Sequence, residues 1–141
     1  EGINLIRNIP GQGIRVWGAR TASSNNNFKY VNVRRLFIFI EESIKANTNW
    51  VVFEPNDVSL WQRVNMTISS FLDTCWRNGM LAGSSPSEGF FVEIGASTMS
   101  KDDIQQGRLI CNIGIAPSRP AEFVIFRVTQ LTAESSGGGE E

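Results

Sequence analysis

The sequence has 141 residues, of which 41% are hydrophobic and 19% are charged, and its formal net charge is −1. A chain of this length is typical of one domain with a single hydrophobic core. The near-neutral charge and the scattered Lys and Arg residues argue against a nucleic-acid partner. The sequence contains no histidine, which is the commonest general base and metal ligand. We therefore expect no catalytic residue, metal site or cofactor.

The N-terminal part of the chain is predicted to be extended. Residues 3–7 are short and apolar and form a lead-in, closed by the turn-prone residues 10–13. Residues 14–17 alternate apolar and polar side chains and predict a strand, and Gly18 at its end indicates a close approach of the backbone. Residues 23–27 are polar and predict a surface loop.

Residues 33–46 carry two competing signals. Residues 36–40 have the aromatic and β-branched content of a buried strand, whereas apolar residues recur at helical spacing along the whole segment. The length of the segment favours a helix, which we expect Asn32 to cap and other elements to bury on more than one side. Residues 50–53 then predict a buried strand that ends before the turn at Pro55.

The clearest helix in the sequence follows Asp57, its predicted N-cap, and stops at residues 78–79. Its polar face contains Arg63 and Arg77. We expect the tryptophans, including Trp76, to be core residues without a ligand role. The apolar stripe of this helix comprises Trp61, Val64, Ile68, Phe71, Leu72 and Cys75.

Short elements complete the predicted fold. Residues 90–94 and 108–115 predict strands, and residues 100–103 predict the cap and first turn of a very short helix that Gly107 ends. Together these elements indicate an α/β (α+β) fold: a single domain with a mixed β-sheet flanked by two main helices.

Patterns that could indicate chemistry have simpler structural explanations. Gly11 and Gly13 precede a strand instead of following one, and no Lys-Ser/Thr pair closes the loop, so the glycines at 11, 13 and 18 indicate turns and not a phosphate-binding loop. The adjacent acidic pairs at 41–42 and 102–103 do not converge, because neighbours on a helix point about 100° apart. Cys75 and Cys111 lack CxxC spacing and are expected to be buried reduced thiols.

The sequence also contains no targeting or membrane signal. No apolar run approaches the ~20 residues of a membrane span, and no export signal is visible at the start of the sequence. We therefore expect the domain to fold in the cytoplasm and to make no membrane contact.

The last predicted strand is the most informative segment. It comprises Glu122, Phe123, Val124, Ile125, Phe126, Arg127 and Val128. This strand is apolar on both faces, and Pro117 and Pro120 in the link before it prevent a tight hairpin with the preceding strand. Addition to a neighbouring molecule's sheet satisfies both conditions. We therefore assign residues 1–131 to the core domain, with 121–131 as its arm, and 132–141 to a flexible, solvated Gly/Ser/Glu tail.

Several longer motifs resemble one family, the contractile tail sheath proteins of bacteriophages, tailocins and extracellular contractile injection systems. The two most specific runs are PGQGIRVWGART at residues 10–21 and YVNVRRLFIFIEESI at residues 30–44. The resemblance covers nearly the whole chain. Further matching runs lie at residues 50–57, 60–61, 107–109, 113–117 and 119–127.

One local departure separates this sequence from the family pattern. Ile94 and Gly95 stand where the family often carries Cys-Asp. Because residues 98–99 and 103–104 fit the pattern again, the departure implies loop variation without loss of function. Family members also carry peripheral domains and an N-terminal arm before this core, which this sequence does not include.

The resemblance implies the C-terminal core domain of a structural subunit without enzymatic activity. Such subunits stack as hexameric rings around an inner tube protein, and sheath contraction drives the tube through a target envelope. The implied partners are further copies of the chain, the inner tube protein, and the baseplate and tail terminator proteins. Assembly is expected in the bacterial cytoplasm, within a phage tail or a released contractile particle. A monomeric α/β ligand-binding or enzymatic domain remains the alternative.

Charged residues that the core does not require are the candidates for contact with the tube. They are Arg63, Arg77 and Asp103. Surface ion pairs contribute about 0 to 1 kcal/mol each, so such a contact would be weak per subunit and would sum over many rings.

Overall fold

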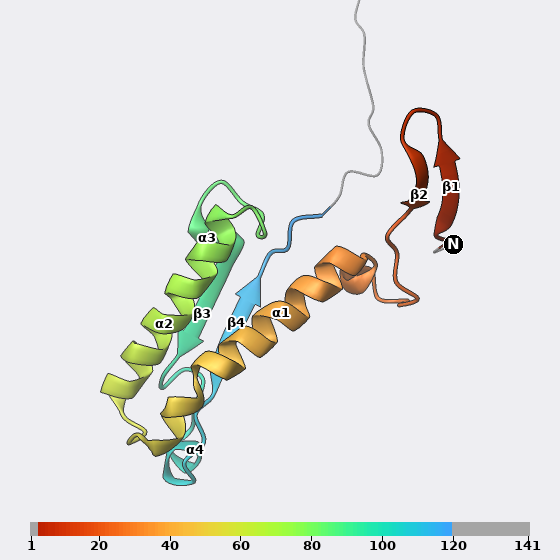
Figure 1. Ribbon diagram of the computed structural model, residues 1–141. Helices are drawn as coiled ribbons and strands as arrows, with labels where there is room; N and C mark the ends of the chain where they lie inside the picture. Colours follow the sequence, from red (N-terminus) through yellow and green to blue (C-terminus); the bar gives the residue numbers. More distant parts are fainter. Residues whose placement is uncertain (1–2, 120–141) are drawn as a thin grey trace, which may run out of the picture.

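The computed structural model describes residues 3–119, so the predicted final strand at 122–128 and the tail at 132–141 lie outside the described residues. The described part combines helices with two two-stranded antiparallel sheets, which confirms the predicted α+β class (Figure 1). In chain order the elements are β1 (Leu5–Ile9), β2 (Gly13–Trp17), the 3₁₀ helix η1 (Asn26–Phe28), α1 (Val31–Asn47), the 3₁₀ helix η2 (Asn49–Phe53), α2 (Val58–Arg77), α3 (Pro86–Gly89), β3 (Phe90–Ile94), α4 (Lys101–Gln105) and β4 (Cys111–Ile115).

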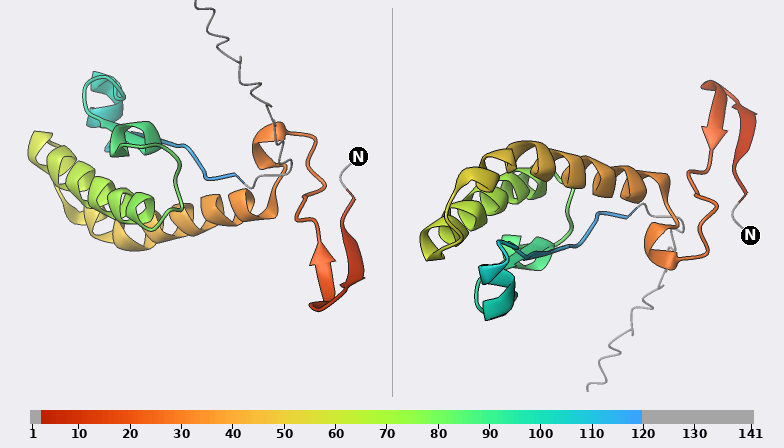
Figure 2. Two further views of the ribbon diagram at one scale, coloured as in Figure 1. Left: turned by 90° about the horizontal axis from the view of Figure 1, so that it is seen from above. Right: turned by 90° about the horizontal axis from the view of Figure 1, so that it is seen from below.

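The main body consists of two layers. Helices α1 and α2 lie on one face of the β3–β4 pair, and α4 lies at the end of the body remote from the N-terminus (Figure 2). Strands β3 and β4 are antiparallel, with Phe90 opposite Ile115 and Ile94 opposite Cys111. The buried core cluster between the layers is Ile40, Leu60, Val64, Ile68, Leu72, Cys75 and Leu81.

Helix α2 forms as the sequence predicts. The Asp57 carboxylate accepts a hydrogen bond from the Leu60 N–H at 2.9 Å, which satisfies a donor that the helix start leaves free. The helix ends at Arg77, and Gly79 continues the chain with φ of 74°, a value that suits glycine. Of the predicted stripe, Trp61 and Phe71 are half-buried and the other four residues are buried.

Helix α1 differs from the prediction at its start and on its outer face. It begins at Val31 after Tyr30, which provides no side-chain cap, and the predicted cap, Asn32, instead donates its side-chain N–H to the Ser118 carbonyl at 3.3 Å. Only one face is buried: Ile38 on the outer face is 46% exposed, and Phe39 at the border of the two faces is 47% exposed and lies beside Phe71 of α2. Within residues 3–119 no second layer covers this outer face.

The predicted buried strand at 50–53 is wrong. These residues form η2, in which the Val51 N–H bonds to the Thr48 carbonyl and the Glu54 N–H bonds to the Val51 carbonyl, both at 3.1 Å. A short link must reverse the chain between α1 and α2, and local i to i−3 hydrogen bonds satisfy its backbone without a sheet partner. The turn leaves Val52 and Phe53 81% and 91% exposed.

The segment around α4 confirms its predicted cap. The Ser100 hydroxyl accepts from the Asp103 N–H at 3.2 Å, and the Asp103 carboxylate accepts from the Ser100 N–H at 2.9 Å, which is a capping box. Strand β4 begins at Cys111 and not at the predicted residue 108. Arg108 is instead held against α4, because its guanidinium donates to the Asp103 carboxylate at 2.8 Å.

Both cysteines are free thiols, as predicted. Cys75 is buried in the core and Cys111 is half-buried on β4. Burial disfavours the thiolate and raises the pKa of both thiols. Both therefore remain protonated and weakly reactive at neutral pH.

Candidate functional site

The hairpin β1–β2 is exposed along nearly its whole length, and it projects away from the helices (Figure 1). Its register pairs Ile6 with Val16 and Asn8 with Ile14, which places the three apolar side chains on one face. Ile6, Ile14 and Val16 are 76%, 76% and 72% exposed. A single subunit thus presents an uncovered apolar strip on a thin two-stranded sheet.

The opposite face of the hairpin is mixed in character. Leu5 pairs with Trp17 and Arg7 pairs with Arg15. The Arg7 guanidinium lies 5.8 Å from the centre of the Trp17 ring, which is a cation–π contact. Trp17 is 54% exposed, so the expectation that it is a core residue is wrong.

The base of the hairpin is tied to the start of α1. The Asn4 side chain donates to the Arg20 carbonyl and accepts from the Arg20 N–H, both at 2.8 Å. The Val31 N–H bonds to the Ala19 carbonyl at 2.9 Å. Gly18 has φ of 109°, and a Cβ at this position would lie 3.0 Å from the Asn4 Oδ1 atom, which confirms the predicted close approach.

The chain leaves β4 along a defined path. The Ala82 N–H bonds to the Ala116 carbonyl at 2.8 Å, and the Ser118 N–H bonds to the Met80 carbonyl at 3.1 Å. Pro117 forms an isolated bridge with Leu81 between these bonds. Residues 116–118 are therefore held extended beside residues 80–82, past the end at which β3 begins.

Two of the three candidate tube-facing residues lie on α2 and take part in local pairs. The Arg63 guanidinium donates to the Glu54 carboxylate at 2.7 Å and lies 5.1 Å from the centre of the Trp50 ring. Arg77 pairs with Asp73 at 2.7 Å and its side chain is 73% exposed. The two arginines are 14 positions apart, or roughly 21 Å along the axis, and point in similar directions at 100° per residue.

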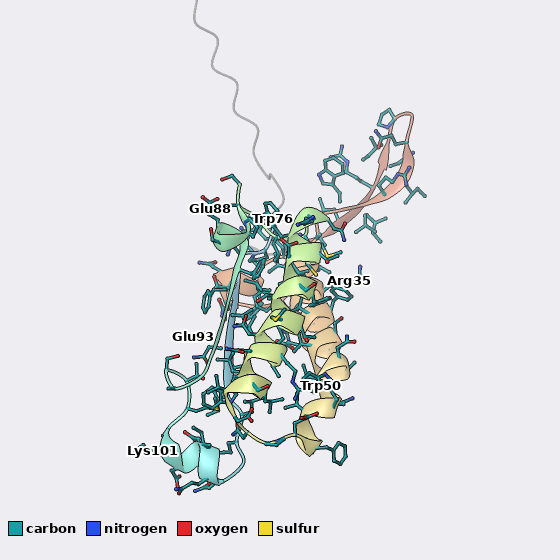
Figure 3. The ribbon with its side chains drawn as sticks, turned by 90° about the vertical axis from the view of Figure 1, so that its left-hand side faces the viewer. Arg35, Trp50, Trp76, Glu88, Glu93 and Lys101 are labelled. Carbon is teal, nitrogen blue, oxygen red and sulfur yellow. The ribbon has the colours of Figure 1, made fainter. Side chains whose placement is uncertain are left out.

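The third candidate, Asp103, is a structural residue of α4. Its carboxylate accepts hydrogen bonds from Ser100 and pairs with Arg108 at 2.7 Å. The Ser100 hydrogen bonds, followed by the Arg108 guanidinium, lower the pKa of Asp103 to about 2. Asp103 therefore stays ionised at neutral pH. Helix α4, on which Lys101 is labelled, lies at the opposite end of the molecule from the hairpin (Figure 3).

The three candidates are not gathered into one site. Arg63 lies near the N-terminal end of α2, the end at which α4 also packs: Ile104 of α4 and Val51 of η2 line one shared cavity. Arg77 lies at the other end of α2, next to Trp76 (Figure 3). Arg63 and Arg77 share one side of α2, whereas Asp103 lies on a separate element, α4.

The part of the chain that the structure describes contains neither a metal-ligand cluster nor an unsatisfied buried polar side chain. Within residues 3–119, no group of three or more His, Cys, Asp or Glu residues is placed to hold a metal ion. In the same range, every buried side-chain nitrogen or oxygen has a hydrogen-bond partner. None of the described helices is both long enough and apolar enough to cross a membrane.

Two exposed apolar features escaped prediction from the sequence. The hairpin was expected only as a lead-in and one strand, although a turn at residues 10–13 between two short segments is a hairpin signal. The exposed pair Val52 and Phe53 has no comparable signal, because its composition favours a buried strand.

Known proteins carry the same architecture. Over 91% of its length the chain is similar to the sheath complex of an extracellular contractile injection system (PVC) in the contracted state, with 45% identity and a TM-score of 0.87. It is also similar to the contracted helical sheath of the anti-feeding prophage (AFP), with 43% identity, a TM-score of 0.84 and 92% of the chain covered.

A phage protein extends the same relationship. The tail sheath protein of Burkholderia phage BcepMu (isolate -/United States/Summer/2002) is 27% identical over 139 residues, which is 95% of this chain. The chain spans only 27% of that protein, and 36% and 37% of the PVC and AFP chains. Residues 23–130 match the model of the phage tail sheath C-terminal domain family. The chain therefore belongs to the phage tail sheath C-terminal domain family.

Proposed function

We propose that this domain is the core of a structural sheath subunit that polymerises as stacked hexameric rings around an inner tube and contracts to drive the tube through a target envelope. The observation that carries the proposal is the uncovered hairpin in one subunit, together with an extended link at residues 116–118 that continues beyond β4. Similarity to chains in contracted sheath assemblies supports the same reading.

The hairpin is an incomplete sheet in physical terms. A two-stranded hairpin is at best marginally stable in water, and both of its edges present unpaired backbone groups. Its apolar face, formed by Ile6, Ile14 and Val16, has no cover within residues 3–119. A further strand from another molecule would pair with an edge and extend the sheet.

The strand at 122–128 of a neighbouring subunit is the occupant that we propose for the hairpin edge. Its two-sided apolar character suits a position inside an enlarged sheet. Each main-chain hydrogen bond contributes a net ~0.5 to 1.5 kcal/mol, so several bonds give a joint of a few kcal/mol before ordering entropy is subtracted. Such a joint lets subunits turn during contraction while they stay connected.

The proposed role requires no reaction at this domain. The energy for contraction would be stored in the extended lattice at assembly. The partners would be the inner tube along the sheath, and the baseplate and the tail terminator at its ends. Assembly would occur in the bacterial cytoplasm, and the product would be a phage tail or a released contractile particle.

Electron microscopy of the expressed full-length protein tests the proposal directly. We expect rods, sheath fragments or rings in negative stain, because each subunit carries both halves of a joint and such head-to-tail contacts propagate. A monodisperse monomer that binds a small molecule would instead support the alternative of a ligand-binding or enzymatic domain.

We also propose that either α2, with Arg63 and Arg77, or the short helix α4, with Asp103, faces the inner tube. Reversing the charge at Arg63 and Arg77 is expected to reduce the yield of extended sheath on tubes while sparing self-assembly of contracted sheath. Arg35→Glu on α1 is the control for a charge reversal elsewhere on the body. Unchanged yield of sheath on tubes after the double reversal would remove the assignment.

A further inference from the structure

The outer edge of β4 has unpaired backbone groups. The Ala116 N–H bonds to the Gly89 carbonyl at 2.8 Å, and Asn65 donates to the Val92 carbonyl from the far side of β3 at 3.3 Å. Successive residues of a strand direct their N–H and C=O groups to opposite edges, so these two bonds place the backbone groups of Ile113 and Ile115 on the edge of β4 away from β3. Among the described residues, nothing bonds to that edge.

The helical layer is also wider than the sheet beneath it. Packed helices are about 8–10 Å apart, whereas neighbouring strands are about 4.7–4.9 Å apart, so two helices cover roughly four strands. The sheet β3–β4 beneath the two helices has only two strands among the described residues. Helix α2 packs closely on β3, and the sheet-facing side of α1 is left over the space beside β4.

A groove occupies that space. Its volume is about 350 Å³. Side chains of α1 form one wall of the groove and side chains of β4 form the other. The charged residues Glu41 and Lys45 of α1 also line the groove. The lining residues are Phe37, Ile40, Glu41, Ile44, Lys45, Ile113 and Ile115. Bare backbone at an edge beside an apolar groove is the arrangement that accepts an added strand, with every second side chain entering the groove.

We propose that an extended segment of the same polypeptide, from the part of a full-length sheath subunit that this domain does not contain, pairs with the β4 edge and fills the groove under α1. The matched sheath chains leave ample length for it, because this chain spans only 36% and 37% of them. The occupant is an intramolecular third strand, so it is present before any sheath forms.

The arm at 121–131 of the same chain is the most local alternative occupant. The described link before it, residues 116–118, is bonded to Met80 and Ala82. Protection of Ile113 and Ile115 that is lost when residues 121–141 are deleted would show that this arm, and not a segment outside this domain, fills the groove. A strand from a second copy remains a competing occupant, and it differs from our proposal in requiring assembly.

Hydrogen–deuterium exchange on the full-length polypeptide, resolved to single residues, distinguishes these occupants. The N–H groups of Asn112 and Gly114 pair with β3 and serve as internal references. In the monomeric fraction, we expect the Ile113 and Ile115 amides to exchange within about tenfold of these references, whereas an open edge would exchange more than about 100-fold faster. Protection that appears only in assembled sheath, or in neither state, would overturn the proposal.

A pair of variants provides a second readout. Ile113→Glu places a charge in the groove and is expected to release the strand, seen as more than about 100-fold faster exchange at Ile115 while Gly114 stays protected. Asn112→Glu carries the same charge on the opposite face of β4 and should leave Ile115 protected. Equal exchange at Ile115 in both variants would contradict a docked strand.

Discussion

Deleting residues 121–141 is expected to leave a folded domain that no longer polymerises, so that rods and rings disappear completely. The deletion removes the proposed donor strand at 122–128, and the described core at residues 3–119 retains all of its packed helices and sheets. Deleting residues 133–141 alone is the matched control and should be tolerated. Sedimentation and negative-stain microscopy measure the assembly, and circular dichroism measures the fold.

A mixing experiment tests the two halves of the joint separately. The deletion variant keeps the hairpin but lacks the strand, whereas Val16→Glu keeps the strand but places a charge on the apolar face of the hairpin. Each should be monomeric alone, and a 1:1 mixture should form a heterodimer that cannot grow. Arg15→Glu, on the other face, should still polymerise.

Two outcomes would show that this mechanism is wrong. If the 121–141 deletion still forms sheath, the strand is not the donor. If the same deletion unfolds the isolated domain, the strand belongs to its own core. Failure of the mixture to form a heterodimer would leave the donor role intact but would remove the hairpin as its acceptor.

Leu72→Ala is expected to reduce the free energy of unfolding by about 2–5 kcal/mol. Leu72 is 0% exposed and belongs to the stripe of α2 that contributes to the buried core cluster. The substitution removes apolar contacts and leaves a cavity that the surrounding side chains fill only partly. Urea unfolding followed by tryptophan fluorescence measures the change.

Phe71→Ala is the matched comparison on the neighbouring residue. The sequence predicts a loss of about 3–5 kcal/mol if Phe71 is buried, but the ring is half-buried and lies 6.0 Å from the Phe39 ring at the edge of the core. We therefore expect a smaller loss than for Leu72→Ala. A larger loss for Phe71→Ala would contradict the burial order of the two residues.

Local features were predictable from the sequence because short-range chemistry decides them. The Asp57 cap, the stop at Gly79 and the Ser100–Asp103 capping box each depend on residues within one or two turns of each other. The spacing of the α2 stripe likewise follows from the helical repeat. The family was also predictable from the sequence, because the long runs shared with tail sheath proteins can be compared directly without a structure.

Only the tertiary structure decided which apolar residues are covered. Composition alone does not distinguish a buried strand from the exposed turn at Val52 and Phe53, because the short link between α1 and α2 imposes the turn. Composition also does not show that β1 pairs with β2 as an uncovered hairpin. Nor does it show that Arg108 binds α4, so that β4 begins at Cys111. Burial depends on what packs against a segment from elsewhere in the chain or from other molecules, and periodicity carries no information about that partner.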